Sequence, residues 1–343
     1  MMRLPLFEFR APQTVQEATR ILEGEGPQTM PLAGGTDLLP NMKRRQQVPR
    51  TLMSLNRIGD LRHASLGEAG SRLGACVTLS EIAADPRFRN GMTALAQAAS
   101  FVATPQIRNM ATLGGNLCLD TRCNYYDQNY EWRKSIGFCL KKDGDTCWVA
   151  PSSSKCMAVS STDTAPALMA LGARVRLVSC SGEREVPLTE LYQNDGIHYI
   201  RRQRNELLTE VLVDSLRGWK STYWKLRRRG SFDFPVLSVA AAVKLSKSGV
   251  VEDARIVVGS VACLPLVAKD ASSFLTGQPL NQDAIAQTAS LAARIAKPLD
   301  NTDFDMTWRK RVTAEFVTCA LRELRGDDMR GDRLLLTRHS SSL

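Results

Sequence analysis

Cysteines are the residues of this sequence with the greatest capacity for chemistry, and five of the nine fall in one short stretch. These five are Cys118, Cys123, Cys139, Cys147 and Cys156. The first residues of the sequence carry no secretory signal, so we expect free thiols or a metal site, not a disulfide framework. The other four lie among apolar neighbours and are predicted to be buried core residues: Cys76, Cys180, Cys263 and Cys319.

The spacing within the cysteine-rich stretch suits a metal centre. Cys123, Cys139, Cys147 and Cys156 are separated by 15, 7 and 8 intervening residues. Four thiolates can hold either an iron–sulfur cluster or zinc. Zinc sites usually pair cysteines two to four residues apart, and no such pair occurs here. The spacing alone therefore leaves three alternatives open, namely an iron–sulfur cluster, zinc, or no metal.

Two glycine-rich segments form a second candidate site. The sequence Pro31–Leu38 contains Gly34-Gly35, and Ala111–Leu117 contains Gly114-Gly115. Paired glycines allow backbone N–H groups to approach phosphate oxygens without an intervening Cβ atom. A tight turn is the alternative interpretation of each pair. Neither segment matches the Rossmann or P-loop pattern, so the residues alone indicate no more than a dinucleotide site.

The elements that must position these residues predict an α/β or α+β opening half, and we expect an α+β fold for the chain. Helical and strand-like patterns alternate up to Pro105, whereas the stretch 119–157 is polar, aromatic and without clear periodicity. A long irregular segment in a compact domain is uncommon unless something orders it, and a metal centre would do so. Beyond Pro235 the pattern predicts a hairpin over 238–261, followed by two amphipathic helices.

The bulk composition is that of a globular protein of two or three domains, with 343 residues, 43% of them hydrophobic. No apolar run approaches the roughly 20 residues of a membrane helix, so we expect a cytoplasmic protein with no membrane contact. The net charge is +10, which favours either general solubility or docking of an acidic partner. The basic residues are scattered and only 6% of residues are aromatic, so we expect no nucleic-acid binding.

Four segments resemble a known family, the FAD-binding medium subunits of the xanthine dehydrogenase and carbon monoxide dehydrogenase type. They are Pro31–Leu38, Thr104–Asn109, Ala111–Leu117 and Ser161–Leu168, and their order and spacing agree along nearly the whole chain. The resemblance implies a vanillyl-alcohol-oxidase-type FAD-binding fold of two α/β subdomains, plus a C-terminal domain of a small antiparallel sheet and helices. The expected limits are 1–58 and 59–218 for the FAD-binding subdomains, 219–330 for the C-terminal domain and 331–343 for a flexible tail.

The same resemblance implies a set of FAD-binding residues. Asp163 and Lys225 are expected to contact FAD, where an ammonium near the flavin would stabilise its reduced, negatively charged form. The alternatives are a helix N-cap for Asp163 and a solvent-facing strand position for Lys225. The full expected set is Met30, Pro31, Leu32, Ala33, Gly34, Gly35, Thr36, Asp37, Val102, Thr112, Leu113, Gly114, Gly115, Asn116, Asp163 and Lys225.

The cysteine-rich stretch at about 119–157 is an insert relative to typical members of this family. Its spacing, and the sequence Cys123-Asn124-Tyr125-Tyr126, are similar to the insert in the flavin subunit of 4-hydroxybenzoyl-CoA reductases. That similarity implies a 4Fe-4S cluster on Cys123, Cys139, Cys147 and Cys156. Cys118 stays outside this set, as either a buried small residue or a thiol near the flavin.

The resemblance implies an electron-transfer subunit in the degradation of aromatic compounds. Electrons from a ferredoxin-type donor would pass toward a molybdenum subunit that removes the phenolic hydroxyl of 4-hydroxybenzoyl-CoA, and another subunit would carry 2Fe-2S clusters. The expected assembly is a dimer of heterotrimers. Two alternatives remain, namely the FAD subunit of an oxidative molybdenum hydroxylase and a zinc-stabilised assembly module without flavin.

Overall fold

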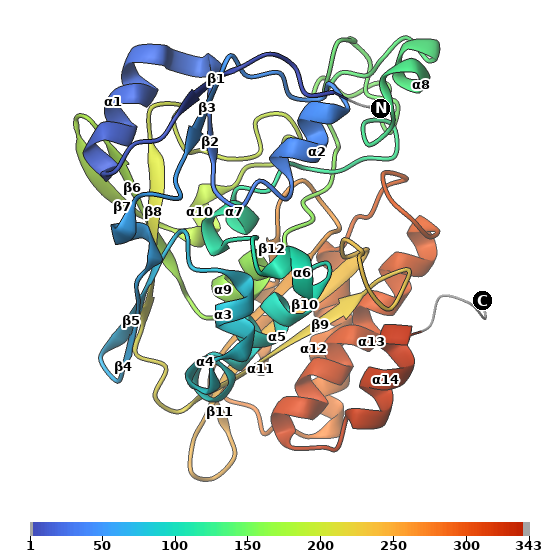
Figure 1. Ribbon diagram of the computed structural model, residues 1–343. Coiled ribbons are helices and arrows are strands. Elements are labelled where there is room, and N and C mark those ends of the chain that lie inside the picture. Colours follow the sequence, from blue (N-terminus) through green and yellow to red (C-terminus); the bar gives the residue numbers. More distant parts are fainter. Residues whose placement is uncertain (1–2, 339–343) are drawn as a thin grey trace.

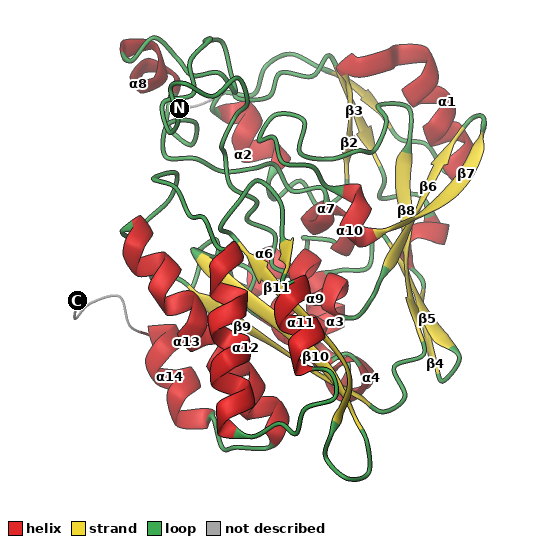
Figure 2. Cartoon of the chain, turned by 180° about the vertical axis from the view of Figure 1, so that it is seen from behind, coloured by secondary structure: helices red, strands yellow, loops and turns green. Residues whose placement is uncertain are grey.

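The computed structural model describes residues 3–338, which form three sheets and the helices that cover them (Figures 1 and 2). The mixed architecture agrees with the expected α+β class. None of the helices in this range combines the length and apolarity that a membrane span requires.

The first sheet is small and parallel, with the strand order β1-β3-β2. Its strands are β1 (Glu8–Arg10), β2 (Thr29–Leu32) and β3 (Thr51–Ser54). Helix α1 (Val15–Glu25) buries Ala18 and Leu22 against this sheet, and the 3-10 turn η1 (Gly26–Gln28) leads into β2. The chain leaves β2 through Gly34-Gly35 and enters α2 (Leu38–Lys43).

The second sheet is antiparallel and has the strand order β4-β5-β8-β6-β7. Its strands are β4 (Ala64–Gly67), β5 (Gly70–Gly74), β6 (Arg174–Ser179), β7 (Gly182–Pro187) and β8 (Leu207–Asp214). The connecting segments contain η2 (Gly59–Arg62), α3 (Leu79–Ala84), α4 (Pro86–Gly91), α5 (Thr93–Ser100), α6 (Pro105–Arg108), α7 (Leu113–Leu117), α9 (Thr164–Ala170) and α10 (Leu188–Leu191). The second glycine pair therefore lies inside a short helix, α7.

The third sheet belongs to the C-terminal part and is antiparallel, in the order β12-β11-β10-β9. Its strands are β9 (Trp219–Leu226), β10 (Leu237–Leu245), β11 (Val251–Gly259) and β12 (Leu266–Val267). One face is covered by α11 (Lys269–Leu275), α12 (Gln282–Ile295) and α13 (Met306–Arg325), as Figure 2 shows. The predicted hairpin over 238–261 corresponds to β10 and β11.

The cysteine-rich stretch contains no strand and one short helix, α8 (Tyr130–Ser135), beside α2 (Figure 1). Side-chain contacts attach this stretch to the end of α2. The fully buried Arg133 donates to the carbonyl of Arg44 at 3.1 Å, and Gln46 donates to the carbonyl of Tyr126 at 2.5 Å. Polar contacts, together with the small apolar cluster around the cysteines, thus order a segment that lacks regular structure.

The flexible tail expected at 331–343 stays a prediction. Helix α14 (Arg330–Arg338) covers part of this segment, and Arg333 pairs with Glu323 of α13. Residues 339–343 lie outside the described range. Cys180 was expected in the core, but it lies at the exposed turn between β6 and β7, whereas Cys76, Cys263 and Cys319 are buried as predicted. The domain limits at 58/59 and 218/219 stay predictions.

Candidate functional site

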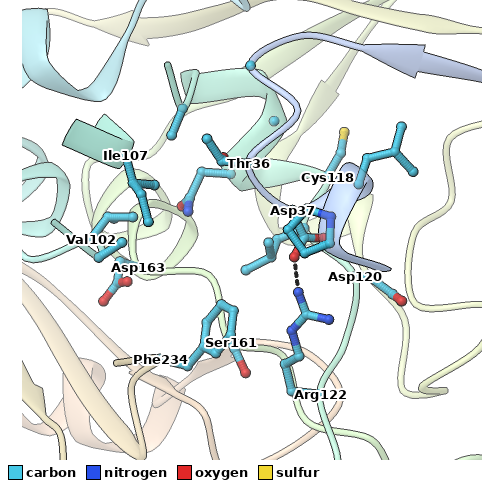
Figure 3. Close-up of a pocket in the computed structure, with 18 of the residues that line it drawn as sticks. Thr36, Asp37, Val102, Ile107, Cys118, Asp120, Arg122, Ser161, Asp163 and Phe234 are labelled. Atoms are coloured by element: carbon cyan, nitrogen blue, oxygen red, sulfur yellow. Dashed lines mark hydrogen bonds and ion pairs between the residues drawn. The ribbon is translucent and has the colours of Figure 1, made fainter. Parts of the chain in front are cut away.

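A cavity of about 670 Å³, called the main cavity below, lies where the three sheets meet. Such a volume is in the range of cofactor sites. Fourteen of the sixteen residues predicted to bind FAD line it; the other two, Leu113 and Lys225, do not. Figure 3 shows Asp37 and Arg122 pointing toward one another at one side of the cavity, with Val102, Ile107 and Asp163 at the other. The tertiary structure therefore brings together two glycine segments that are far apart in the sequence.

The glycines permit this close approach between loops. A Cβ atom added at Gly34 would lie 1.8 Å from the carbonyl oxygen of Met110, so only glycine allows the two segments to touch. Gly35 has a φ of +70°, a left-handed conformation that glycine adopts without strain. At Gly114 an added Cβ would lie 2.7 Å from the Cβ of Ala75. Both glycine pairs thus have structural requirements of their own, in addition to any ligand.

The polar residues of the second glycine segment mainly organise the protein. The hydroxyl of Thr112 accepts the N–H of Gly115 at 3.1 Å and so caps α7. The side-chain oxygen of Asn116 accepts the hydroxyls of Thr162 and Thr164, at 2.8 and 2.7 Å. These bonds fix α7 against the start of α9, and therefore fix the backbone of the glycine segment at the cavity wall.

Asp163 and Lys225 form a buried ion pair of 3.0 Å, and only Asp163 faces the main cavity. The ammonium of Lys225 also donates to the carbonyls of Phe101 and Asp233, both at 2.9 Å, so its three N–H bonds are used. The other carboxylate oxygen of Asp163 accepts the hydroxyl of Tyr223 at 2.7 Å. Asp163 precedes α9, but its side chain makes no capping hydrogen bond there.

Burial and the attraction between the two groups shift the pKa values of Asp163 and Lys225 in opposite directions. Burial raises the pKa of Asp163 and lowers the pKa of Lys225, while the attraction between the two groups opposes both shifts. The three hydrogen bonds of Lys225 fit a protonated amine, so we describe the pair as ionised. Lys225 therefore acts on the cavity through Asp163, whose carboxylate it holds in place.

Basic and aromatic residues of the cavity wall were not predicted from the sequence. Arg122 is buried, pairs with Asp37, donates to Asn41 at 3.1 Å and stacks over the ring of Phe234 at 4.8 Å. Burial lowers its pKa. Four further arginines line the cavity: Arg44, Arg202, Arg228 and Arg229. The run of arginines at 227–229 was a visible signal in the sequence, but Arg122 gave none because its partner lies in a different part of the chain.

The four predicted metal ligands converge on a second, small pocket, called the cysteine pocket below. All four are buried free thiols, and Tyr125, Tyr126 and Trp148 also line the pocket. Burial raises the pKa of Cys123 to about 12 and that of Cys156 to about 11, so these thiols are neutral when no metal is bound.

Glycines leave room for this arrangement of thiols. A Cβ added at Gly196 would lie 2.7 Å from the sulfur of Cys156, and one added at Gly144 would lie 2.8 Å from the backbone nitrogen of Cys139. Cys263 lies behind the pocket and donates to the carbonyl of Cys156 at 3.4 Å. Within residues 3–338, no group of three or more Cys, His, Asp or Glu side chains is arranged to hold a single metal ion.

Comparisons with known proteins support the assignment of the main cavity as an FAD site. Residues 5–213 match the model of the FAD binding domain in molybdopterin dehydrogenase, and residues 221–324 match the CO dehydrogenase flavoprotein C-terminal domain. The aldehyde oxidoreductase FAD-binding subunit of Escherichia coli (strain K12) is 32% identical over 82% of this chain and 88% of its own. The nicotinate dehydrogenase FAD-subunit of Eubacterium barkeri is 29% identical over 88% of this chain and 87% of its own.

A solved structure has the same fold as this chain. The carbon monoxide dehydrogenase from Hydrogenophaga pseudoflava contains a chain that superposes with a TM-score of 0.77 at 26% identity, covering 94% of this chain and 99% of that chain. The expected arrangement, an FAD-binding region followed by a C-terminal domain of antiparallel sheet and helices, is confirmed. The chain therefore belongs to the family of FAD-binding medium subunits of molybdenum hydroxylases, the family of the xanthine and carbon monoxide dehydrogenases.

Proposed function

We propose that this chain is the FAD and 4Fe-4S electron-transfer subunit of a molybdenum enzyme that reductively dehydroxylates 4-hydroxybenzoyl-CoA to benzoyl-CoA. The convergence of Cys123, Cys139, Cys147 and Cys156 on one pocket beside the main cavity carries this proposal. The family membership supplies the flavin and the molybdenum context.

The residues of the main cavity fit FAD. The N–H groups of Gly114 and Gly115 are bonded within the protein, to the carbonyl of Ala75 and the hydroxyl of Thr112, so the turn at Gly34-Gly35 is the segment better suited to the pyrophosphate. Five arginines on the wall can donate hydrogen bonds to an anionic cofactor, and four of them are also paired with aspartates of the same wall: Arg44, Arg122, Arg228 and Arg229. Asp163 offers a fixed carboxylate that can accept a hydrogen bond from a flavin N–H group. When bound, FAD would supply the ability to exchange electrons singly or in pairs.

The residues of the cysteine pocket fit a 4Fe-4S cluster in their chemistry. Each thiolate of such a cluster binds a different iron atom, so the four sulfurs need not converge on one point as ligands of a single ion do. Aromatic side chains cover the pocket and restrict the access of water. A cluster there would supply one-electron chemistry at low potential, which a reductive enzyme needs and an oxidative one does not.

The proposed partners follow from the same function. A molybdenum-cofactor subunit would carry out the dehydroxylation, a 2Fe-2S subunit would link it to this chain, and a ferredoxin-type protein would donate electrons. We propose a dimer of heterotrimers. The net charge of +10 supports docking of an acidic donor, because opposite charges accelerate association.

Metal analysis of cysteine variants tests the cluster. We expect the purified complex to hold about four irons and four sulfides per flavin in addition to those of the 2Fe-2S subunit, and Cys139→Ser and Cys147→Ser to lose most of these additional irons. Cys180→Ser is the matched control, since this exposed thiol lies at a turn far from the pocket, and it should keep its iron. Iron content unchanged in both pocket variants, or zinc in place of iron, would overturn the cluster assignment.

A substrate assay tests the direction of electron flow. The assembled complex, supplied with reduced ferredoxin, should consume 4-hydroxybenzoyl-CoA and form benzoyl-CoA. The second candidate is the FAD subunit of an oxidative hydroxylase, and its support is the names of two relatives, an aldehyde oxidoreductase and a nicotinate dehydrogenase. Failure to consume the phenolic thioester, together with oxidation of an aldehyde or N-heterocycle, would support that second candidate.

A further inference from the structure

The cysteine-rich stretch begins and ends on two chain segments that lie side by side. Arg122 and Val159 exchange two backbone hydrogen bonds, of 2.8 and 2.7 Å, in an antiparallel bridge. In an antiparallel ladder the next hydrogen-bonded pair lies two residues further along each chain. That pair would consist of Asn124 and Met157, and one of its bonds would run from the N–H of Asn124 to the carbonyl of Met157.

A residue of the C-terminal part, Asn301, takes the place of this bond. It lies in the loop between α12 and α13 and is 3% exposed. Its backbone carbonyl accepts the N–H of Asn124 at 3.0 Å, and its side-chain amide donates to the carbonyl of Met157 at 2.7 Å. Both groups that would have paired with one another are therefore satisfied by a third chain segment that stands between them.

The inserted residue keeps the two ends of the cysteine-rich stretch apart. Paired strands lie about 4.8 Å from one another, and a residue placed between two chains holds them further apart than that. Cys123 and Cys156 directly precede the two separated residues, one on each chain, and both line the cysteine pocket. The position of Asn301 therefore sets how widely the pocket opens between these two thiols.

Arg309 of α13 fixes the loops that reach the cysteine-rich stretch. Its fully buried guanidinium donates to the carbonyls of Leu299 at 2.9 Å and Ser260 at 2.6 Å. Leu299 is in the loop of Asn301, and Ser260 is in the loop after β11 that carries Cys263. One buried side chain thus holds both loops of the C-terminal part that contact the two ends of the stretch.

We infer that Asn301 is a wedge that holds the base of the cysteine-rich stretch open to the width of the metal centre. For the metal centre, the inference rests on the proposed function. Asn301 is a positioning residue, because it acts through the backbone of Asn124 and Met157 and is not one of the four ligands. The C-terminal part thereby holds in place a centre that it does not ligate.

The variant Asn301→Leu tests the wedge, because it removes the donor to Met157 and keeps a side chain of similar size. The matched control is Asn281→Leu, which removes an asparagine side chain that accepts the N–H of Ala284 at 2.9 Å and caps α12 in the same part of the chain. Cys263→Ala is a milder second variant, which removes the contact of Cys263 with the carbonyl of Cys156.

Two measurements on the purified complex follow the wedge. The first is the decay of the EPR signal of the reduced 4Fe-4S cluster during incubation with an iron chelator. The second is hydrogen exchange at amides bonded within the stretch, such as those of Asp127 and Leu140. We expect both to become about tenfold faster in Asn301→Leu, as for the loss of one buried hydrogen bond, and less so in Cys263→Ala. Asn281→Leu should match the wild type.

Wild-type rates in both Asn301→Leu and Cys263→Ala would overturn the inference. Equal acceleration in Asn281→Leu would also overturn it, because the effect would then reflect general stability. A wild-type complex without a 4Fe-4S signal would defeat the proposed function and leave the wedge to hydrogen exchange. In that case faster exchange in Asn301→Leu than in Asn281→Leu supports the wedge, and equal exchange overturns it.

Discussion

At the scale of single residues, Lys225 shows how a buried charge can serve a site that it does not touch. Its ammonium joins the end of α5, the start of α9 and the loop after β9 through three hydrogen bonds. Two of the acceptors are backbone carbonyls, and the third is the carboxylate of Asp163, which faces the cavity. The residue therefore fixes the position of Asp163 and of two segments of the cavity wall.

We expect Lys225→Met to destabilise the protein by about 3–5 kcal/mol, because it leaves the Asp163 carboxylate buried and unpaired. Bound flavin should fall in parallel, since the carboxylate loses its fixed orientation. Chemical denaturation and the ratio of flavin to protein absorbance measure the two effects. The control Lys220→Met changes an exposed lysine on the same strand, β9, and should leave both quantities unchanged. Normal stability and flavin content in Lys225→Met would contradict the assigned role.

At the scale of elements, the two glycine segments act as one unit because their backbones touch. The approach of Gly34 to Met110 couples the turn after β2 to the segment before α7. Thr112 caps α7, and the side chain of Asn116 connects α7 to the start of α9. The wall of the cavity consequently depends on contacts among three elements.

Gly34→Ala should disrupt this unit. The added Cβ would overlap a backbone oxygen that cannot move away as a flexible side chain could, so the two segments must separate. We expect FAD affinity to fall at least tenfold, or about 1.4 kcal/mol. Equilibrium titration of the flavin-free protein with FAD measures the change.

The control for that experiment is Gly24→Ala, in the exposed part of α1, where an added Cβ meets nothing within 4 Å. It should leave the affinity unchanged and stabilise the helix by roughly 0.5–1 kcal/mol. Equal FAD affinity in both variants would show that the contact between the glycine segments is not needed for binding.

Glu323 joins three elements of the C-terminal part and makes their packing dependent on pH. It accepts hydrogen bonds from Thr222 and Trp224 of β9 and pairs with Arg333 of α14. Burial works to raise the pKa of Glu323, but the ion pair and the hydrogen bonds outweigh burial and hold the pKa below its usual value.

A lowered pKa in the folded state gives stability that is present above the unfolded pKa and is lost as the pH falls. We therefore expect this contribution to be complete at pH 7 and to disappear progressively below about pH 4.3. Glu323→Gln should cost about 2 kcal/mol at pH 7 and much less at pH 3. Urea denaturation at both pH values checks this, and an equal cost at both would show that the charge is not involved.

At the scale of the whole molecule, one hydrophobic core crosses the boundary between the FAD-binding region and the C-terminal domain. The cluster that contains Leu113 and Leu168 also contains Tyr223, Ala240 and Val257 from the third sheet. The buried Asp163–Lys225 pair crosses the same boundary. The two regions that match separate family models are therefore joined by apolar packing and by a buried ion pair.

We expect a single cooperative unfolding transition as a consequence. Neither region can lose its structure without exposing the shared core, so calorimetry should give equal calorimetric and van't Hoff enthalpies. The fragment 219–343 expressed alone should be poorly folded and should bind a hydrophobic dye. Two resolved transitions, or a folded fragment, would show that the regions are independent.

The sequence by itself determined many of the elements, and fourteen of the sixteen residues predicted to bind FAD line the cavity. Local patterns such as the glycine pairs and the hairpin over 238–261 depend on neighbours within a few positions, so they were predictable. The resemblance to a known family then placed Asp163 at the site. The four cysteines of the insert could be grouped by their spacing, although spacing alone left zinc and iron–sulfur open.

Only the tertiary structure decided which charged residues of the two sites pair with one another. It brought Arg122 to Asp37, and it placed Lys141 against Asp120 in the wall between the two sites. It also placed Lys225 behind Asp163, outside the cavity lining. These partners are separated by between 21 and 85 positions in the sequence. No local pattern encodes such pairs, because the burial that makes each pair necessary exists only after the chain has folded.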